Sequence, residues 1–340
     1  MKVSTLVFAG TLLASSLASA TTASYQFCST SGSASSCKSG GSATVTSTYA
    51  QTRYPLVMAH GMGGFTAIGG LSIGQYFYGI NSDLTANGAK VFATQVTSFD
   101  SSYVRGEQLL SQVKQIMAIT GSPKVNLIGH SQGTMDSRYV AAIIPSKIAS
   151  VTGVGGPNLG SPVADTIKAA STIPVLGPVL KPLITGGIDA FFKLLDMSSG
   201  QAYTNSSWNG LNQLTTAGSA AFNAQFPQGM PSTKCGNGAD SGGGEGSSVV
   251  KYYSWGGTRH LTNLLDISDP FMALTGAMIS GPNDGLVSQC SSHLGLVIRD
   301  DYSQNHLDEV NLVFGLVDVF SASPVTLYRN QANRLKTAGL

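Results

Sequence analysis

The sequence predicts an α/β fold in which a mostly parallel sheet carries helices on both faces. Short apolar runs without polar alternation indicate strands that are buried on both sides. Segments with the apolar spacing of amphipathic helices separate these runs. A chain in which strands and helices alternate favours a parallel sheet that is covered on both faces.

Five apolar runs are expected to be strands. They are residues 54–60, 91–96, 124–128, 151–154 and 251–255. Residues 104–119 place apolar side chains one helical turn apart, and a second helix is expected from Gln132 to about Ile144. Residues 21–52 are rich in Ser, Thr and Gly, so they are expected to form an exposed leader outside the core.

Residues 1–20 have the parts of a secretory signal peptide, namely Lys2, an apolar stretch and the small-residue end Ala18-Ser19-Ala20. The apolar stretch is short and no basic cluster follows it, which argues against a membrane anchor. Residues 21–340 are then expected to leave the cytoplasm as a single domain. Without Lys2 the formal net charge falls from +2 to +1, which is no electrostatic footprint for nucleic-acid binding.

Two segments interrupt the alternation of strands and helices. Residues 173–195 are highly apolar, but prolines and charged residues inside them argue against a membrane span. We expect short amphipathic helices there, which form a lid insertion near residues 170–200. Ordinary core helices are the alternative. Residues 235–248 contain a run of glycines and are expected to form a flexible loop.

The four cysteines all lie in the part of the chain that is expected to be exported. An even number of cysteines in an oxidising compartment favours disulfides. Cys28 with Cys37 would close a local loop, and Cys235 with Cys290 would close a long one. Spacing by itself leaves the other pairings open.

A serine stands between two glycines in Gly129-His130-Ser131-Gln132-Gly133, directly after a predicted strand. This pattern is typical of a nucleophile elbow, a tight strand-to-helix turn that presents the serine hydroxyl to a substrate. Glycine is required on both sides because side chains there would collide with the neighbouring chain. A plain Gly/Ser turn is the alternative interpretation.

A serine nucleophile needs a base, and in chains with this elbow the base comes last, after the acid. His306 lies late in the chain, where that order puts the base. His60 and His130 precede Ser131, and His260 and His293 lack a clear motif. The sequence therefore favours His306 as the base.

The acid that orients the base must lie between Ser131 and His306. Asp284 is the best candidate, because it stands in a Gly/Pro/Asn-rich turn just before an apolar pair. The competing carboxylates are Asp266, Asp269, Asp300 and Asp301.

Donors for a developing oxyanion are also expected near the first apolar run. The glycine-rich residues 60–65 follow that run, so their backbone can approach a ligand closely. Backbone N–H groups of this loop can supply half of an oxyanion hole, and the N–H of Gln132 can supply the other half.

Together these segments resemble the secreted bacterial triacylglycerol lipases of family I, the Pseudomonas type. The matching segments are residues 60–62, 129–133, 265–269, 283–287 and 305–311. The similarity extends from about residue 54 to the C-terminus. The resemblance implies an α/β-hydrolase fold with a mobile lid and one bound Ca²⁺.

Carried over by position, the resemblance implies a catalytic triad of Ser131, Asp284 and His306. It also assigns the oxyanion donors to the backbone N–H groups of Met62 and Gln132. These roles agree with the order of residues that the elbow motif requires.

The resemblance further implies four calcium ligands. They are the carboxylates of Asp266 and Asp308 and the backbone carbonyls of Leu312 and Leu316. A ligand set made only of oxygens suits a hard cation.

The disulfide of the family maps to Cys235 and Cys290. Cys28 and Cys37 lie in an N-terminal extension outside the family pattern, and they are a candidate for a second disulfide.

The resulting hypothesis is a secreted, calcium-stabilised lipase that hydrolyses long-chain acylglycerol esters at a lipid–water interface by an acyl-enzyme mechanism. The alternatives are an esterase or polyester depolymerase with the same triad, or a secreted lipid-binding protein with a dead hydrolase fold. A lipase-specific foldase is the partner that the resemblance suggests for secretion.

Overall fold

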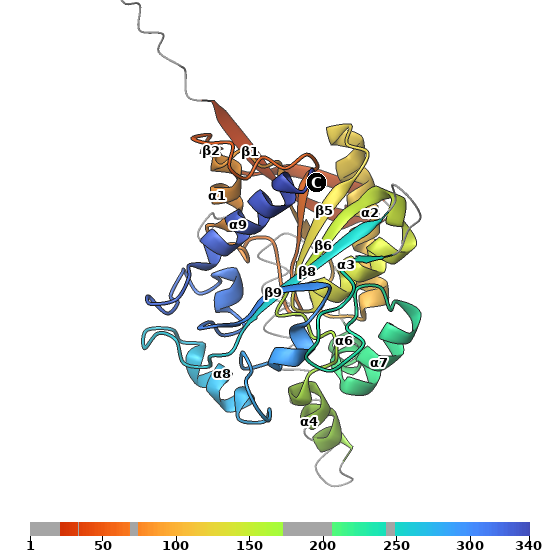
Figure 1. Ribbon diagram of the computed structural model, residues 1–340, viewed down its shortest axis with the longest axis vertical. Helices are drawn as coiled ribbons and strands as arrows, with labels where there is room; N and C mark the ends of the chain where they lie inside the picture. Colours follow the sequence, from red (N-terminus) through yellow and green to blue (C-terminus); the bar gives the residue numbers. More distant parts are fainter. Residues whose placement is uncertain (1–20, 33, 69–73, 173–205, 243–248) are drawn as a thin grey trace, which may run out of the picture.

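The computed structural model describes residues 21–340 apart from 33, 69–73, 173–205 and 243–248. Its described part contains a 9-stranded sheet in the order β2-β1-β4-β3-β5-β6-β8-β7, and β9 also pairs with β8 (Figure 1). The strands are β1 (Thr22–Ser31), β2 (Ala34–Thr44), β3 (Leu56–Ala59), β4 (Val91–Gln95), β5 (Val125–His130), β6 (Ile148–Val154), β7 (Ser241–Gly242), β8 (Val250–Gly257) and β9 (Leu296–Tyr302). The expectation of a mostly parallel sheet is confirmed, since within the described chain only the β1–β2 and β7–β8 pairs are antiparallel.

Helices follow most of the strands along the chain. The α-helices described are α1 (Ile80–Ala86), α2 (Ser102–Thr120), α3 (Gln132–Ile143), α4 (Pro162–Ser171), α6 (Ser207–Leu214), α7 (Thr216–Gln225), α8 (Asp269–Gly276) and α9 (Pro324–Thr337). Short 3₁₀ turns are η2 (Pro145–Lys147), η4 (Gln289–Ser292) and η5 (Asp308–Val310). The five predicted strands are confirmed as β3, β4, β5, β6 and β8, and the two predicted helices as α2 and α3.

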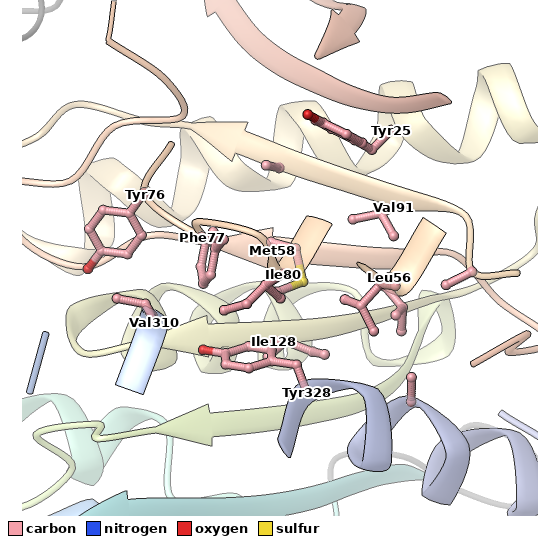
Figure 2. Close-up of a cluster of buried hydrophobic side chains, with 14 of the residues drawn as sticks. Tyr25, Leu56, Met58, Tyr76, Phe77, Ile80, Val91, Ile128, Val310 and Tyr328 are labelled. Carbon is pink, nitrogen blue, oxygen red and sulfur yellow. The ribbon is translucent and has the colours of Figure 1, made fainter. Parts of the chain in front are cut away.

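The central strands are buried on both faces, as their apolar runs predict. In β3, Leu56 and Met58 pack in one apolar cluster with side chains of α1 and α9 (Figure 2). Val57 and Ala59 pack in a second cluster with side chains of α2 and α3. Successive side chains of a strand point to opposite faces, so each face of the sheet receives its own helical layer.

The ends of α2 lie where its sequence favours them. Ser101 caps the first turn, because its hydroxyl accepts a hydrogen bond from the N–H of Val104. Gly121 ends the helix with a left-handed φ of 63°, a conformation that glycine adopts without steric cost.

The N-terminal expectation was wrong. Residues 22–44 are not an exposed leader but a hairpin of β1 and β2, and β1 pairs in parallel with β4. Tyr25 and Phe27 are buried in the same apolar cluster as Leu56 and Met58, and Figure 2 shows Tyr25 in this cluster. The sequence of the hairpin is polar because β2 is an edge strand with many exposed residues. A few buried aromatic side chains of β1 suffice to hold the hairpin against the core.

Two disulfides join the described chain. Cys28 and Cys37 are direct partners across the hairpin, with Cα atoms 4.0 Å apart. Cys235 and Cys290 form the second bond. Both pairs that the sequence suggested are therefore present.

Three predicted segments fall outside the described residues, wholly or in part. The signal peptide at residues 1–20 and the lid segment at residues 173–195 lie outside them. The glycine-rich loop is described as far as residue 242, where β7 pairs with β8. None of the helices in the described ranges is long and apolar enough to cross a membrane.

Candidate active site

Ser131 lies at a sharp turn between β5 and α3. Its φ of 54° and ψ of −129° are unusual for a residue with a side chain, as expected of a nucleophile elbow. A Cβ atom added to Gly129 would lie 2.2 Å from the carbonyl oxygen of Gly133, and one added to Gly133 would lie 2.3 Å from that of Ala59. The turn can therefore form only with glycine at both positions.

His306 and Asp284 come together at the carboxyl ends of the parallel strands. The ring centroid of His306 lies 4.6 Å from that of His130, the last residue of β5. The Nδ1 atom of His306 lies 2.7 Å from Oδ2 of Asp284, and both side chains are buried. The other carboxylate oxygen of Asp284 accepts hydrogen bonds from the N–H groups of Leu286 and Val287, at 2.8 and 2.7 Å. The backbone N–H of His306 also donates to the carbonyl of Asp284. Each residue is thus held by both its main chain and its side chain.

The competing carboxylates lie with other partners. Asp300 pairs with His293 at 2.9 Å, and Asp301 pairs with Arg299. Asp269 accepts hydrogen bonds from the backbone of Thr262 and Asn263 and from the side chain of Asn305. Of the five candidate acids, Asp284 is the one that the described structure joins to His306 by a hydrogen bond.

The loop at residues 60–65 is held by Arg105 of α2. Its guanidinium donates to the carbonyls of His60 and Gly61, at 2.7 and 3.2 Å, and forms a buried ion pair with Asp136 at 2.8 Å. The N–H of Gly64 also donates to the carbonyl of Gly61. A trans peptide points its N–H away from its C=O, so these bonds fix the direction of the Met62 N–H.

Gln132 is the first residue of α3, where backbone N–H groups have no partner within the helix. Its side chain donates to the carbonyl of Asp100 at 2.8 Å, which ties the start of α3 to the chain after β4. The N–H of Ser131 donates to the carbonyl of Val154. The two proposed oxyanion donors, Met62 and Gln132, thus lie on segments that hydrogen bonds hold in place.

Asp266 and Asp308 lie in one cluster of buried carboxylates. Burial raises the pKa of Asp308 to about 7, and the charges of Asp266 and Asp269 add to this effect. One carboxylate oxygen of Asp266, Oδ2, is buried without a hydrogen-bond partner in the described structure. Negative charge that is crowded in this way fits a bound cation.

The two carbonyls that the resemblance implies as calcium ligands lie on a neighbouring loop. The side chain of Asn263 donates to the carbonyl of Val317 at 3.1 Å, so the Asp266 loop contacts the loop that carries Leu312 and Leu316. The carbonyl of Leu312 accepts one hydrogen bond, from Phe314, and a carbonyl oxygen has a second lone pair. The donor set therefore fits a hard divalent cation.

Sequence reasoning missed the buried carboxyl of Glu309. Its Oε2 lies 3.4 Å from Nε2 of His130 and 3.9 Å from Nδ1 of His306, and its Oε1 accepts from the N–H of Gly257 at 2.7 Å. Burial, and then the charge of Asp284, raises the pKa of Glu309 well above its usual value. The only signal in the sequence was its place three residues after His306, one helical turn away.

The fold and this site define an α/β-hydrolase. A family model described as the alpha/beta hydrolase fold matches residues 54–244, which is more than half of the chain. A metagenomic carboxyl esterase superimposes with a TM-score of 0.54 at 16% identity, covering 86% of this chain and 77% of that one. A Bacillus licheniformis lipase, BlEst2, in its mature form gives a TM-score of 0.50 at 16% identity, covering 77% and 87%. These likenesses bear on the fold alone.

Closer relatives define the family within that class. A triacylglycerol lipase of Vibrio cholerae is 48% identical over 293 residues, which cover 86% of this chain and 90% of the relative. A triacylglycerol lipase of Pseudomonas fragi is 41% identical over 301 residues, which cover 85% and 98%. The chain belongs to the bacterial triacylglycerol lipases and is a carboxylic ester hydrolase.

Proposed function

We propose that the protein is a secreted, calcium-stabilised lipase that hydrolyses long-chain acylglycerols at a lipid–water interface. Its catalytic groups are Ser131, His306 and Asp284. The observation that carries the proposal is the 2.7 Å contact between His306 and Asp284 beside the strand-to-helix turn that bears Ser131. The relatives named triacylglycerol lipase support acylglycerols as the substrate class.

Acylation begins at the hydroxyl of Ser131. Asp284 accepts the Nδ1 proton of His306, so Nε2 is the nitrogen that takes the serine proton. The serine oxygen attacks the ester carbonyl, and the resulting oxyanion accepts hydrogen bonds from the N–H groups of Met62 and Gln132. The ester bond then breaks as His306 gives its proton to the leaving alcohol.

Deacylation repeats these steps with water as the nucleophile. His306 takes a proton from the water, which attacks the acyl group on Ser131. The second tetrahedral intermediate collapses when His306 returns the proton to Ser131. The fatty acid leaves and the free enzyme is restored.

The surface near the site supports a water-insoluble substrate. Large apolar side chains are exposed on two loops that lie beside the segments bearing Asp284 and His306. They are Leu261, Leu264, Leu265, Ile267, Phe271, Leu274 and Met278 on the first loop and α8, and Phe314, Val319 and Phe320 on the second. The acids between them, Asp266 and Asp269, are buried, so no exposed charged side chain lies between Leu261 and Met278. Such an apolar surface suits contact with lipid better than recognition of a small soluble ester.

We propose that Asp266, Asp308 and the carbonyls of Leu312 and Leu316 hold one Ca²⁺. The ion supplies positive charge to a cluster of buried carboxylates and takes no part in bond breaking. Asp308 lies two residues after His306, so the bound ion stabilises the loop that carries the base.

Export and folding are further parts of the proposal. Two disulfides support an oxidising compartment outside the cytoplasm. The signal peptide at residues 1–20, the lid at residues 173–195 and a lipase-specific foldase stay predictions.

The decisive experiment replaces the nucleophile. Ser131→Ala should lower kcat by at least about 10³-fold on an emulsified triglyceride, because nucleophile and base act as a unit. A fluorophosphonate should label the wild-type protein at Ser131 and leave the variant unlabelled. Ser111→Ala, whose hydroxyl lies 2.7 Å from that of Ser35 in β2, is the matched control and should keep full activity. Full activity of Ser131→Ala would refute the proposal, and it would favour neither the lipase nor the esterase.

A chain-length series separates a lipase from an esterase or a polyester depolymerase. We expect rates to rise with acyl length and to increase abruptly when the substrate exceeds its solubility and forms an emulsion. A smooth saturation curve across the solubility limit would favour the esterase. Release of soluble fragments from a polyester film, without triglyceride hydrolysis, would favour the depolymerase.

A further inference from the structure

Two buried polar side chains next to the site have no role in the proposed reaction. Tyr76 precedes α1 and His130 is the last residue of β5; they expose 4% and 0% of their surface. Tyr76 belongs to the apolar cluster in Figure 2, among residues that otherwise carry few polar atoms. Buried polar groups are costly unless they form hydrogen bonds, so their partners indicate what they stabilise.

These side chains link two loops through a continuous chain of hydrogen bonds. The N–H of Gly61 lies 3.1 Å from the hydroxyl oxygen of Tyr76, and that oxygen lies 2.7 Å from Nδ1 of His130. The Nε2 atom of His130 lies 2.9 Å from the carbonyl oxygen of His306. One end of the chain is the loop of Met62, and the other end is the backbone of the base.

The two ends determine the direction of every bond. A backbone N–H can only donate, so Gly61 donates to Tyr76. A carbonyl can only accept, so the proton of His130 is on Nε2 and its Nδ1 is an acceptor. The hydroxyl of Tyr76 therefore donates to Nδ1. Burial, and then the charge of His306, lowers the pKa of His130 well below its usual value. The imidazole therefore stays neutral, as the series of hydrogen bonds requires.

Other groups around His130 agree with this assignment. The Oε2 atom of Glu309 lies 3.4 Å from Nε2, farther than the carbonyl of His306. The ring of His306 lies with its centroid 4.6 Å from that of His130. The nearest acceptor for Nε2–H is thus the main chain of the base.

The chain of bonds passes directly beside the nucleophile. A Cβ atom added to Gly61 would lie 2.7 Å from Cβ of Ser131 and 2.9 Å from the hydroxyl of Tyr76. Arg105 holds the same loop by the carbonyls of His60 and Gly61, and Tyr76 holds it by the N–H of Gly61. Both polar groups of the peptide between His60 and Gly61 are therefore hydrogen-bonded, the C=O to Arg105 and the N–H to Tyr76.

We infer that Tyr76 and His130 are a pair of positioning residues that align the loop at residues 60–65 with Ser131 and His306. Tyr76 fixes the peptide between His60 and Gly61, one residue before the Met62 N–H, and His130 fixes the main chain of His306. The inference rests on the proposed function, because it assigns to Met62 and His306 their roles in that reaction. An oxyanion donor acts mainly in the transition state, so loss of its alignment lowers kcat more than it raises KM.

Tyr76→Phe tests the inference with the folded, full-length protein. The change removes one hydroxyl and leaves Gly61 N–H and His130 Nδ1 without their partner. We expect kcat for a soluble short-chain p-nitrophenyl ester to fall about 10-fold or more, with KM within about twofold of wild type. The rate of Ser131 labelling by a fluorophosphonate should fall in parallel, because that reaction also places an oxygen in the oxyanion hole.

Tyr328→Phe is the matched control. Tyr328 belongs to the same buried cluster, exposes 0% of its surface, and its hydroxyl has no hydrogen-bond partner in the described structure. Figure 2 shows both tyrosines among the same apolar side chains. This variant should keep the kcat and the labelling rate of wild type, because it changes the core and not the chain of bonds.

His130→Asn provides a second, independent variant. It removes the Nε2–H group that donates to the carbonyl of His306, although the amide oxygen of asparagine can still accept from Tyr76, and it should give the same selective loss of kcat. If the two residues act through one chain of bonds, the double variant should lose less than the product of the two single losses. Circular dichroism and thermal melting identify variants that do not fold, and each single variant carries the test by itself.

The outcomes separate the inference from the function on which it rests. A folded Tyr76→Phe or His130→Asn variant with wild-type kcat would overturn the inference, as would an equal loss of kcat in Tyr328→Phe. If Ser131→Ala kept its activity, the proposed function would fail instead. An inactive Ser131→Ala together with unaltered Tyr76→Phe leaves the lipase mechanism intact and rejects the positioning pair alone.

Discussion

The imidazole of His306 is bonded to Asp284 across 22 positions of sequence, with 2.7 Å between Nδ1 and Oδ2. The two residues are also joined through their main chains, because the N–H of His306 donates to the carbonyl of Asp284. A second carboxyl, that of Glu309, lies 3.9 Å from the same Nδ1. This arrangement determines how the site should respond when one charge is removed.

Asp284→Asn should lower kcat by roughly 10- to 10²-fold, a smaller loss than that of Ser131→Ala. The charge of Asp284 raises the pKa of Glu309, so its removal lets Glu309 ionise more easily beside His306. Steady-state kinetics on a soluble ester measures the loss. Asp300→Asn is the control, because Asp300 pairs with His293 instead. Wild-type kcat in Asp284→Asn would show that another acid orients the base.

Removal of calcium should lower stability more than it changes chemistry. A ligand present at a hundredfold excess over its Kd stabilises the folded state by about 2.7 kcal/mol. For a chain of this size we expect chelation to lower Tm by roughly 4 °C. Scanning calorimetry with and without Ca²⁺ measures this shift. Asp308→Ala should melt at the chelated temperature whether or not calcium is added, whereas equal melting of wild type in both buffers would refute the site.

The effect of calcium should depend on pH. Burial raises the pKa of Asp308 to about 7 in the folded, metal-free protein, above the ordinary value of about 3.9 in the unfolded chain. The folded state therefore keeps a proton that the unfolded state releases. The stability that this proton provides is complete below about pH 4, and it is lost as the pH rises through about 7.

Ca²⁺ binds the ionised carboxylate, so it replaces the stability that the proton provided. The increase in Tm on adding Ca²⁺ to metal-free protein should grow from pH 5 to pH 8 and then level off. Asp308→Asn should show a small increase that does not change with pH. An equal increase in wild type at pH 5 and pH 8 would contradict the role of Asp308.

The two disulfides should differ in their contribution to stability. They join cysteines 9 and 55 positions apart, and loop entropy assigns them about 2.5 and about 4 kcal/mol. Urea unfolding of the double variants Cys28→Ser/Cys37→Ser and Cys235→Ser/Cys290→Ser measures both. The first variant should keep full activity, because Figure 1 shows β1 and β2 at the far end of the molecule from α8 and α4. Loss of kcat in a folded hairpin variant would count against this separation.

Local sequence determined the centre of the fold. Uninterrupted apolar runs became strands buried on both faces, and helical spacing became α2 and α3, because periodicity and burial are linked directly. Gly129 and Gly133 around Ser131 predicted a tight elbow, and the close contacts at both glycines explain why no other residue fits. The resemblance to a known family named His306 and Asp284 in advance.

Tertiary structure decided what depended on partners distant in sequence. Residues 21–52 were expected to form a polar leader, but residues 22–44 contain β1 and β2, and β1 pairs with β4. β2 is an edge strand with many exposed residues, so it carries little apolar pattern that sequence could reveal. The sequence also could not predict the burial of Glu309. Nor could it predict the hydrogen bonds that link Gly61 through Tyr76 and His130 to His306. A hydrogen bond requires two groups to lie close together in space. The local sequence around either residue does not determine which distant group will lie next to it.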